Sequence, residues 1–249
     1  MTAAQLFDLT GKVALVTGGS RGLGREMVLG FARAGADVAI TSRKREACEA
    51  VAADVTAMGR AALVHPCHIG HWDELEPLVD AVYERFGRID ILVNNAGMSP
   101  LAPSLLETSE ALFDKIVDVN LKGPFRLAAL VGARMKAAGG GAIINISSTG
   151  AIRPAPRFAA YAASKAGLNA LTTALAFEYG PEVRVNTISP GQFLTDVSAA
   201  WPPEQRERTP GAIPRCGDPA EIVGTALYLA SAASSYVTGA ILRVDGGLP

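Results

Sequence analysis

The sequence predicts an α/β protein built on a doubly wound parallel sheet of about seven strands, with helices on both faces. Short apolar runs alternate along the chain with segments of helix length. The runs are rich in β-branched residues and are flanked by Gly, Pro, Asn or Asp, as buried parallel strands usually are. A glycine-rich turn follows the first run and opens the first helical segment. Alternation repeated this often implies right-handed crossovers between parallel strands.

The alternation gives the expected elements in chain order. Strands are expected at residues 12–17, 37–41, 61–65, 89–93, 142–147, 183–188 and 240–244. Helices are expected at residues 25–34, 72–86, 124–138, 158–178 and 220–230. The chain shows neither a linker nor a repeat, so residues 1–249 are predicted to form a single domain.

Residues 192–216 interrupt this alternation with four prolines. A long proline-interrupted loop in a compact domain is often a functional element. We expect it to cover a substrate, with an apolar lid supplied by Phe193, Leu194, Val197 and Trp201. A plain surface insertion is the alternative.

Charge and cysteine content exclude several classes of function. The chain has 23 basic and 24 acidic residues, a net charge of −1 and no long block of like charge. It therefore offers no footprint for nucleic acid and no polybasic membrane anchor. Three cysteines without a CxxC spacing favour a reducing compartment over a disulfide scaffold. No signal peptide and no run of ~20 apolar residues is found, so we expect a cytoplasmic protein.

The turn TGGSRGLG at residues 17–24 predicts a Rossmann-like dinucleotide site. Gly18 allows the tight turn, Gly22 lets the backbone approach a pyrophosphate, and Gly24 permits close packing of helix on strand. The N-terminus of the helix then offers free N–H groups to the phosphates. A turn without a ligand is the alternative, but the position between a strand and a helix favours the dinucleotide.

Tyr161 is the candidate acid–base group for a reaction at an alcohol or ketone. Its ordinary pKa of about 10 is too high for a base near neutrality, so positive charge must lower it. Lys165 lies four residues later on the same helix face and is expected to supply that charge. Ser148 ends a predicted strand, at the edge where such sheets bind ligands, and its hydroxyl can hold a carbonyl oxygen. A Tyr and a Lys that share a helix face by chance are the alternative, and Ser148, thirteen residues before Tyr161, favours a site.

The residues after the second strand predict NADP(H), with NAD(H) as the alternative cofactor. NAD enzymes of this fold place an acidic residue there to bind the ribose 2′-hydroxyl. The chain has Ser42, followed by Arg43 and Lys44, while Asp37 begins the strand and is too distant. Arg43, with Arg21 from the glycine-rich turn, is expected to bind a 2′-phosphate. Solvated surface arginines are the alternative.

The spacing TGxxxGxG resembles that of the short-chain dehydrogenase/reductase family, and other motifs of the family follow in order. They are NNAG at residues 94–97, Asn120, Ser148, Tyr161-x-x-x-Lys165, Pro190-Gly191 and VDGG at residues 244–247. The resemblance covers nearly the whole chain and implies a catalytic tetrad of Asn120, Ser148, Tyr161 and Lys165. In the family the serine polarises the substrate and the tyrosine is the acid–base group. The lysine also holds the nicotinamide ribose, and the asparagine supports a water chain to it.

The resemblance also implies cofactor contacts and an assembly. The expected cofactor-binding residues are Gly18, Ser20, Arg21, Gly22, Leu23, Gly24, Ser42, Arg43, His68, Ile69, Asn94, Ala96, Gly97, Tyr161, Lys165, Pro190, Gly191 and Thr195. The expected assembly is a homotetramer, with the helix at residues 158–178 and the C-terminal strand at the subunit contacts.

One segment departs from the family's pattern. His68 stands where the family usually has an aspartate that contacts adenine, although an imidazole can still hydrogen-bond or stack there. His65, Cys67 and His71 lie close by in an HxCHxxH spacing that also suggests a transition-metal site. No carboxylate or second cysteine completes a tetrahedral set, so we expect no metal.

These residues predict an oxidoreductase that transfers a hydride between NADP(H) and a ketone or secondary alcohol. One alternative is a 3-oxoacyl-carrier-protein reductase, for which Arg134 and Lys136 offer only a small basic patch. A non-catalytic, cofactor-sensing binding protein is another, and the intact Ser, Tyr and Lys argue against it. Arg153 and Arg157, in the loop expected to border the cleft, either hold a carboxylate or phosphate of the substrate or are solvated.

Overall fold

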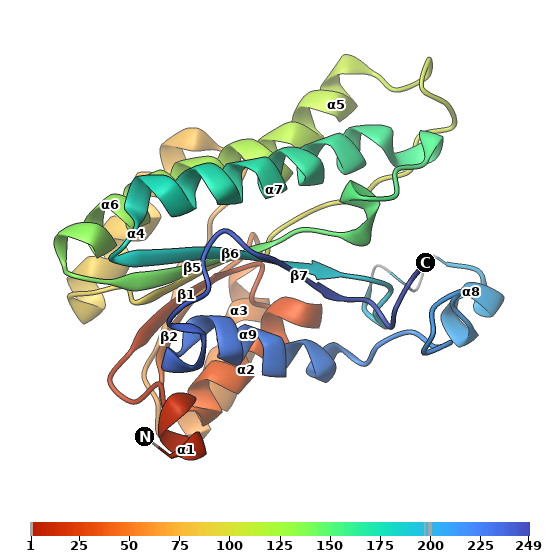
Figure 1. Cartoon of the computed structure of the whole chain (residues 1–249). Coiled ribbons are helices and arrows are strands. Elements are labelled where there is room, and N and C mark those ends of the chain that lie inside the picture. The colour runs from red at the N-terminus through yellow and green to blue at the C-terminus, as the bar shows by residue number, and fades with distance from the viewer. Residues whose placement is uncertain (1, 197, 199–200) are drawn as a thin grey trace.

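The computed structural model describes residues 2–196, 198 and 201–249, and within them seven parallel strands form one sheet (Figure 1). The order β3-β2-β1-β4-β5-β6-β7 confirms the predicted doubly wound sheet. Val197 of the predicted lid lies outside the described residues. The strands are β1 (Val13–Thr17), β2 (Asp37–Thr41), β3 (Ala62–Val64), β4 (Ile91–Asn94), β5 (Gly141–Ile146), β6 (Val183–Pro190) and β7 (Ile241–Val244).

Helices cover both faces of the sheet (Figure 1). One face carries α2 (Gly22–Arg33), α3 (Arg45–Ala57) and α9 (Val223–Ala230). The other carries α4 (Trp72–Phe86), α6 (Gly123–Ala137) and α7 (Ala159–Tyr179). The shorter helices are α1 (Ala3–Leu6), α5 (Glu110–Val117) and α8 (Pro203–Glu207). Among the described residues, no helix is long and apolar enough to cross a membrane.

Most expected elements are found within a few residues of their predicted bounds. The helix expected at residues 25–34 begins earlier, at Gly22, because the glycine-rich turn itself forms its first turn. Besides the short α1 and α8, two longer helices, α3 and α5, were not predicted. They bury few side chains, namely Cys48, Val51 and Val55 in α3 and Ile116 in α5, so their apolar stripes are thin.

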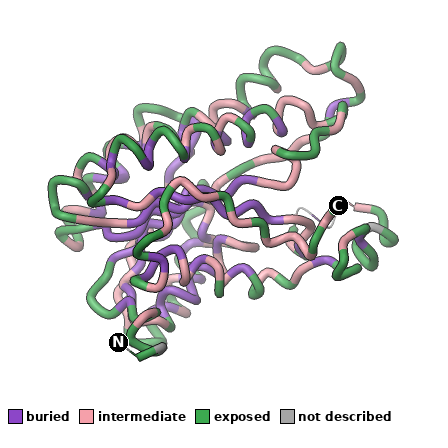
Figure 2. Tube along the Cα trace, viewed as in Figure 1, coloured by how far each residue is buried: buried purple, intermediate pink, exposed green. Residues whose placement is uncertain are grey.

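The sheet separates two apolar clusters, and all five residues of β1 are buried between them. Ala14 and Val16 belong to the cluster that contains residues of α2, α3 and α9. Val13 and Leu15 belong to the cluster under α4, α6 and α7. Figure 2 shows the inner strands of the sheet mainly in purple, while the edge strands β3 and β7 contain no buried residue. A strand covered on both faces needs apolar residues at every position, which explains the unbroken run.

Three irregular segments gather at the carboxyl edge of the sheet. Residues 95–109 follow β4, residues 147–158 follow β5 and residues 191–218 follow β6. Because the strands are parallel, their carboxyl ends lie at one edge, on the right of Figure 1 near α8 and the C-terminus. This is the edge at which open α/β sheets bind ligands.

Candidate active site

The glycine-rich turn has a shape that side chains would obstruct. Gly18 and Gly22 adopt φ values of 64° and 52°, which L-residues rarely adopt. A Cβ on Gly24 would collide with the carbonyl oxygen of Gly18. Arg21, the residue before α2, has no side-chain cap, so the first N–H groups of the helix remain free for a ligand.

Two residues that sequence analysis did not single out hold this turn in place. The amide of Asn95 donates to the carbonyl oxygens of Thr17 (2.9 Å) and Gly18 (3.2 Å). The Thr17 hydroxyl accepts from the backbone N–H groups of Asn95 (2.9 Å) and Ala96 (3.0 Å). Asn95 is the second asparagine of the NNAG motif, whereas the cofactor contact was expected at the first, Asn94.

Asn94 instead points into the core. Its side-chain nitrogen donates to Oδ1 of Asn145 (2.9 Å), and Asn145 donates in turn to Thr172 (2.9 Å) on α7. Only the backbone of Asn94 is therefore left to approach a cofactor. The network ties β4 and β5 to the helix that carries Tyr161.

The structure brings the four residues of the expected tetrad together from three parts of the chain. Ser148 follows β5 and hydrogen-bonds to Tyr161 on α7. Lys165 is buried, and its ammonium donates to the carbonyl oxygen of Ile146 (2.7 Å). Asn120 lies in a π-helical turn, Asp118–Lys122, between α5 and α6.

Gly97 marks the point where Asn120 and Lys165 converge. A Cβ at Gly97 would lie 3.1 Å from Oδ1 of Asn120 and 3.5 Å from Nζ of Lys165. Asn120 is fully buried and exchanges two hydrogen bonds of 2.9 Å with the backbone of Met98. The π-helical turn, which often occurs at functional sites, accounts for a helix-unfavourable asparagine at this position.

The acid–base state of the site differs from the sequence-based expectation. Burial raises the pKa of Tyr161, and the hydrogen bond with Ser148 offsets part of that rise. Burial also lowers the pKa of Lys165 from 10.5 to about 8. The expectation that Lys165 lowers the pKa of Tyr161 is therefore wrong for this structure, because removing the phenolate from water outweighs the favourable contacts. Tyr161 carries its proton at neutral pH.

At the end of β2, Arg43 is exposed and has no ion pair within the described part of the chain. The Ser42 hydroxyl lies 3.1 Å from Sγ of Cys48. Burial and the positive charges of His71 and Arg43 lower the pKa of His68. Arg43, after β2, and His68, after β3, therefore lie close enough for the charge of Arg43 to act on the imidazole.

The HxCHxxH segment is a turn organised by Glu74, which sequence analysis did not identify. Its carboxylate accepts from the N–H of His68 (2.7 Å) and pairs with Nδ1 of His71 (2.7 Å). The two histidine rings are stacked with centroids 4.1 Å apart. Among the described residues, no three His, Cys, Asp or Glu side chains are grouped to hold a metal.

Arg21 has a carboxylate partner in this structure. Its guanidinium pairs with Asp196 (3.1 Å), and Gly22 beside it lies against the side chain of Thr195. The chain folds the loop after β6 over the glycine-rich turn, which supplies a carboxylate that local sequence did not reveal. Both partners are exposed, so the pair contributes about 0–1 kcal/mol.

The remaining predicted residues lie around the same edge. Ser20 is in the turn after β1, and Leu23 packs on the core cluster of α2. Ile69 is buried beneath Gly123. Pro190 ends β6, and the N–H of Gly191 donates to the carbonyl oxygen of Val244 (3.0 Å).

The loop at residues 192–216 is anchored at both ends. Phe193 bridges to Gly217 and is buried in the core, so its assignment to an apolar lid is wrong. The N–H of Ile213 donates to the carbonyl oxygen of Gly246 (2.8 Å) after β7. Leu194 is exposed and Trp201 is half-buried.

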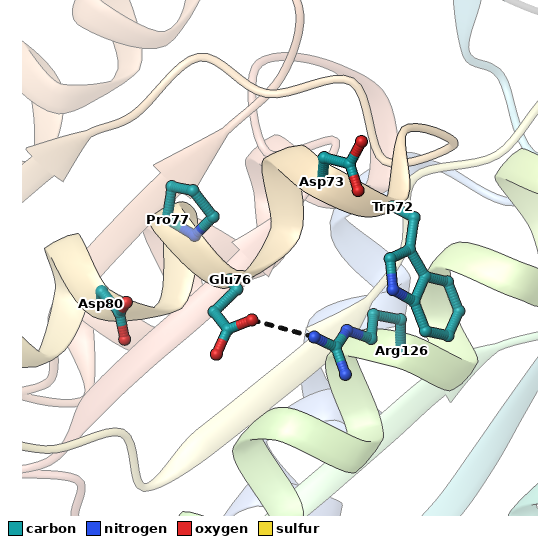
Figure 3. A pocket seen from close by; sticks show the side chains of 6 residues that line it. All are labelled: Trp72, Asp73, Glu76, Pro77, Asp80 and Arg126. Carbon is teal, nitrogen blue, oxygen red and sulfur yellow. Dashed lines mark hydrogen bonds and ion pairs between the residues drawn. The ribbon is translucent and has the colours of Figure 1, made fainter.

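A hollow of about 400 Å³ between α4 and α6 lies away from this edge (Figure 3). Arg126 stacks on the Trp72 ring at 4.8 Å and pairs with Glu76 (3.0 Å). Arg126 thus already has a carboxylate partner, and none of the tetrad lines the hollow.

Comparisons with known proteins agree with this geometry. Residues 18–249 match the family model described as enoyl-(acyl carrier protein) reductase. A solved short-chain type dehydrogenase/reductase from Mycobacterium marinum is 36% identical, with a TM-score of 0.92 and 98% of each chain covered. The NADPH-dependent 3-quinuclidinone reductase from Rhodotorula rubra is 32% identical, with a TM-score of 0.93 over 99% of this chain and 94% of that one.

A third solved structure is a 7α-hydroxysteroid dehydrogenase complexed with NADH and 7-oxo glycochenodeoxycholic acid. It is 36% identical, with a TM-score of 0.93 over 99% of this chain and 98% of that one. The chain belongs to the short-chain dehydrogenase/reductase family, as its motifs indicated. It is an oxidoreductase of alcohol and ketone groups that binds NAD(H) or NADP(H).

Proposed function

We propose that the protein transfers a hydride between NADP(H) and a ketone or secondary alcohol in the site of Ser148, Tyr161 and Lys165. The juxtaposition of Ser148 and Tyr161 at the carboxyl edge of the sheet carries this proposal: a Cβ on Gly150 would lie 3.3 Å from Oγ of Ser148 and 3.4 Å from the Tyr161 ring. Two hydroxyls joined at one point are suited to a single oxygen atom of a substrate. A binding protein without turnover would need neither this pair nor a buried lysine behind it.

The glycine-rich turn fits a dinucleotide. Any side chain at Gly24 would close the approach to the turn, and the free N–H groups at the start of α2 suit a pyrophosphate. Gly97, beside Lys165, similarly keeps the nicotinamide side of the edge open. When bound, the nicotinamide donates or accepts the hydride.

The side chains then supply orientation and the proton. Ser148 donates a hydrogen bond to the carbonyl oxygen and holds it against Tyr161. Tyr161 is protonated at neutral pH and gives its proton to that oxygen during reduction, because burial raises its pKa. Lys165 keeps a positive charge close to the site on the Ile146 carbonyl, and Asn120 fixes the Gly97–Met98 segment beside it.

A panel of ketones and secondary alcohols tests this function. Purified protein is assayed with NADPH, NADH and their oxidised forms, and turnover is followed by absorbance of the nicotinamide. We expect turnover of at least one member. Absence of turnover with every member and both cofactors would contradict the proposal.

Arg43 supports the choice of NADP(H). It is an exposed guanidinium without a counterion in the described residues, and Ser42 stands where an acidic residue would favour NAD(H). A 2′-phosphate would give Arg43 a charge-assisted, bidentate partner. Arg21 contributes to binding of the 2′-phosphate only if the phosphate displaces Asp196 from its guanidinium.

Replacing Arg43 by alanine is expected to lower the ratio of kcat/KM for NADPH over NADH by about 10–100-fold, since a charge-assisted hydrogen bond contributes about 1.5–3 kcal/mol. The measurement is kcat/KM for NADPH divided by kcat/KM for NADH, determined with one reducible ketone in wild type and variant. Arg33→Ala, an exposed arginine at the far end of α2, is the control and should leave the ratio unchanged. A wild-type preference for NADH, or an unchanged ratio in Arg43→Ala, would contradict the assignment.

A 3-oxoacyl-carrier-protein reductase is a less favoured function, although the matching family model is described as a carrier-protein reductase. Of the two cations in the basic patch that it requires, one is paired with a carboxylate and the other is hydrogen-bonded to the backbone. Arg134 pairs with Asp80 (2.6 Å), and Lys136 donates to the carbonyl oxygen of Glu178 (2.8 Å).

We also propose a homotetramer. An apolar groove of about 600 Å³ runs between the α5–α6 region and α7, and Phe177 on α7 is 86% exposed. Such a face is unusual on a monomer. The groove is lined by Val117, Leu121, Lys122, Phe125, Gly167, Ala170, Leu171 and Ala174.

Ala170→Arg is expected to shift the assembly to a smaller species, because a buried unpaired charge would disrupt an apolar contact. Light scattering measures the mass of wild type and variant. A monomeric wild type at micromolar concentration would contradict the tetramer.

A further inference from the structure

The arginines of the chain differ in whether they have a partner. Most pair with a carboxylate, donate to a carbonyl or hydroxyl, or stack on an aromatic ring. Within the described residues, the exceptions are Arg33, Arg43, Arg153, Arg157, Arg206 and Arg208, all exposed.

Two of these exceptions have an explanation elsewhere. Arg33 lies in the last turn of α2, where a cation is favoured by the helix dipole. Arg43 is assigned above to a 2′-phosphate. The remaining arginines all lie in two segments at the carboxyl edge of the sheet.

The segment between Ser148 and Tyr161 is the more strongly charged of the two. Residues 149–158 contain two arginines and no acidic residue. Arg206 and Arg208 alternate with Glu204 and Glu207, so the charge of α8 and its end is balanced. Of these two segments, only the one between Ser148 and Tyr161 therefore carries a net positive charge, from Arg153 and Arg157.

Both arginines lie in the short segment that joins Ser148 to Tyr161. Gly150 packs between Ser148 and Tyr161, since a Cβ on it would lie 3.3 Å from Oγ of Ser148 and 3.4 Å from the Tyr161 ring. The N–H of Arg153 donates to the carbonyl oxygen of Thr149 (2.9 Å), which sets it one turn from Ser148. Arg157 lies four residues before Tyr161, in the 3₁₀ turn Pro156–Phe158 that precedes α7.

We propose that the substrate carries a carboxylate or another anionic group, bound by Arg153 with Arg157 as the second cation. This inference rests on the proposed function of the same site. The two guanidinium groups lie four positions apart in a segment without acidic residues, and no carboxylate pairs with either among the described residues. An anionic group of the substrate can supply that partner and accept bidentate hydrogen bonds from a guanidinium.

Matched substrates test the charge requirement. Acetoacetate and levulinate are compared with their primary amides, and dihydroxyacetone phosphate is compared with dihydroxyacetone. For wild type we expect kcat/KM to favour the anion of a pair by about tenfold or more, equivalent to one charge-assisted contact. Comparison of the two keto acids with dihydroxyacetone phosphate shows whether the site prefers a carboxylate or a phosphate.

Variants then test the residues. Arg153→Ala is expected to bring the anion-to-amide ratio close to one, mainly through KM for the anion, with little change for the amide. Arg153→Lys should retain part of the preference, because charge remains while the bidentate geometry is lost. Arg157→Ala should reduce the ratio less, and Arg33→Ala is the control that leaves it unchanged.

Two outcomes would overturn the inference while leaving the proposed function intact. One is equal turnover of acids and amides by wild type, and the other is an anion preference that survives in both Arg153→Ala and Arg157→Ala. If no ketone is turned over at all, the proposed function fails instead. Calorimetric titration of the same acids and amides into NADP-loaded protein then decides: acid binding that Arg153→Ala weakens supports the inference, and any other result refutes it.

Discussion

Replacing Tyr161 by phenylalanine is expected to lower kcat for ketone reduction by about 10²–10⁴-fold, the usual contribution of a general acid. The variant loses the hydroxyl that hydrogen-bonds to Ser148 and delivers the proton. The ring stays, and with it the edge contact to Phe158, whose centroid lies 6.4 Å away. Folding and the Kd for NADPH should therefore be unchanged.

The measurement combines kcat from nicotinamide absorbance with Kd from NADPH fluorescence. Tyr236→Phe is the matched control, because Tyr236 is fully exposed and should tolerate the same change. Retention of more than about a tenth of kcat in Tyr161→Phe is inconsistent with a general acid at this position.

Replacing Lys165 by methionine is expected to change how stability depends on pH. The folded-state pKa of Lys165 is about 8, against 10.5 for an exposed lysine. Between these values the unfolded chain binds more protons, so the free energy of unfolding of wild type rises with pH. Below pH 8 the buried lysine costs about 3 kcal/mol relative to the unfolded chain, at about 1.4 kcal/mol per pKa unit.

Methionine keeps the length of the side chain without a charge, so the variant should lack this rise. It also leaves the Ile146 carbonyl without its donor, which costs about 1–3 kcal/mol at every pH. Urea unfolding at several pH values between 7 and 10.5 measures the difference. Lys115→Met on the exposed face of α5 is the control and should track wild type.

If the free energy of unfolding has the same pH dependence in wild type and Lys165→Met, the pKa of Lys165 is not lowered in the folded protein and the prediction is wrong. The same variant should also lose most turnover, because the positive charge beside the site is gone. A stable but inactive protein is thus the expected result at neutral pH.

The local pattern of the chain was enough to predict its fold. Strands buried on both faces need continuous apolar runs, and the crossovers between them need helices of a fixed minimum length, so alternation alone defines a doubly wound sheet. The glycine-rich turn was predictable for a similar reason, since positive φ at Gly18 and Gly22 requires glycine. The spacing of Tyr161 and Lys165 likewise fixed their common helix face.

Partners that come from distant parts of the chain were decided only by the tertiary structure. Adjacent asparagines point in different directions after β4, so Asn94 enters the core and Asn95 holds the turn. Arg21 pairs with Asp196, which lies 175 positions later in the sequence. Burial, not the neighbouring lysine, sets the pKa of Tyr161, because desolvation depends on how all surrounding elements pack and no local spacing encodes it.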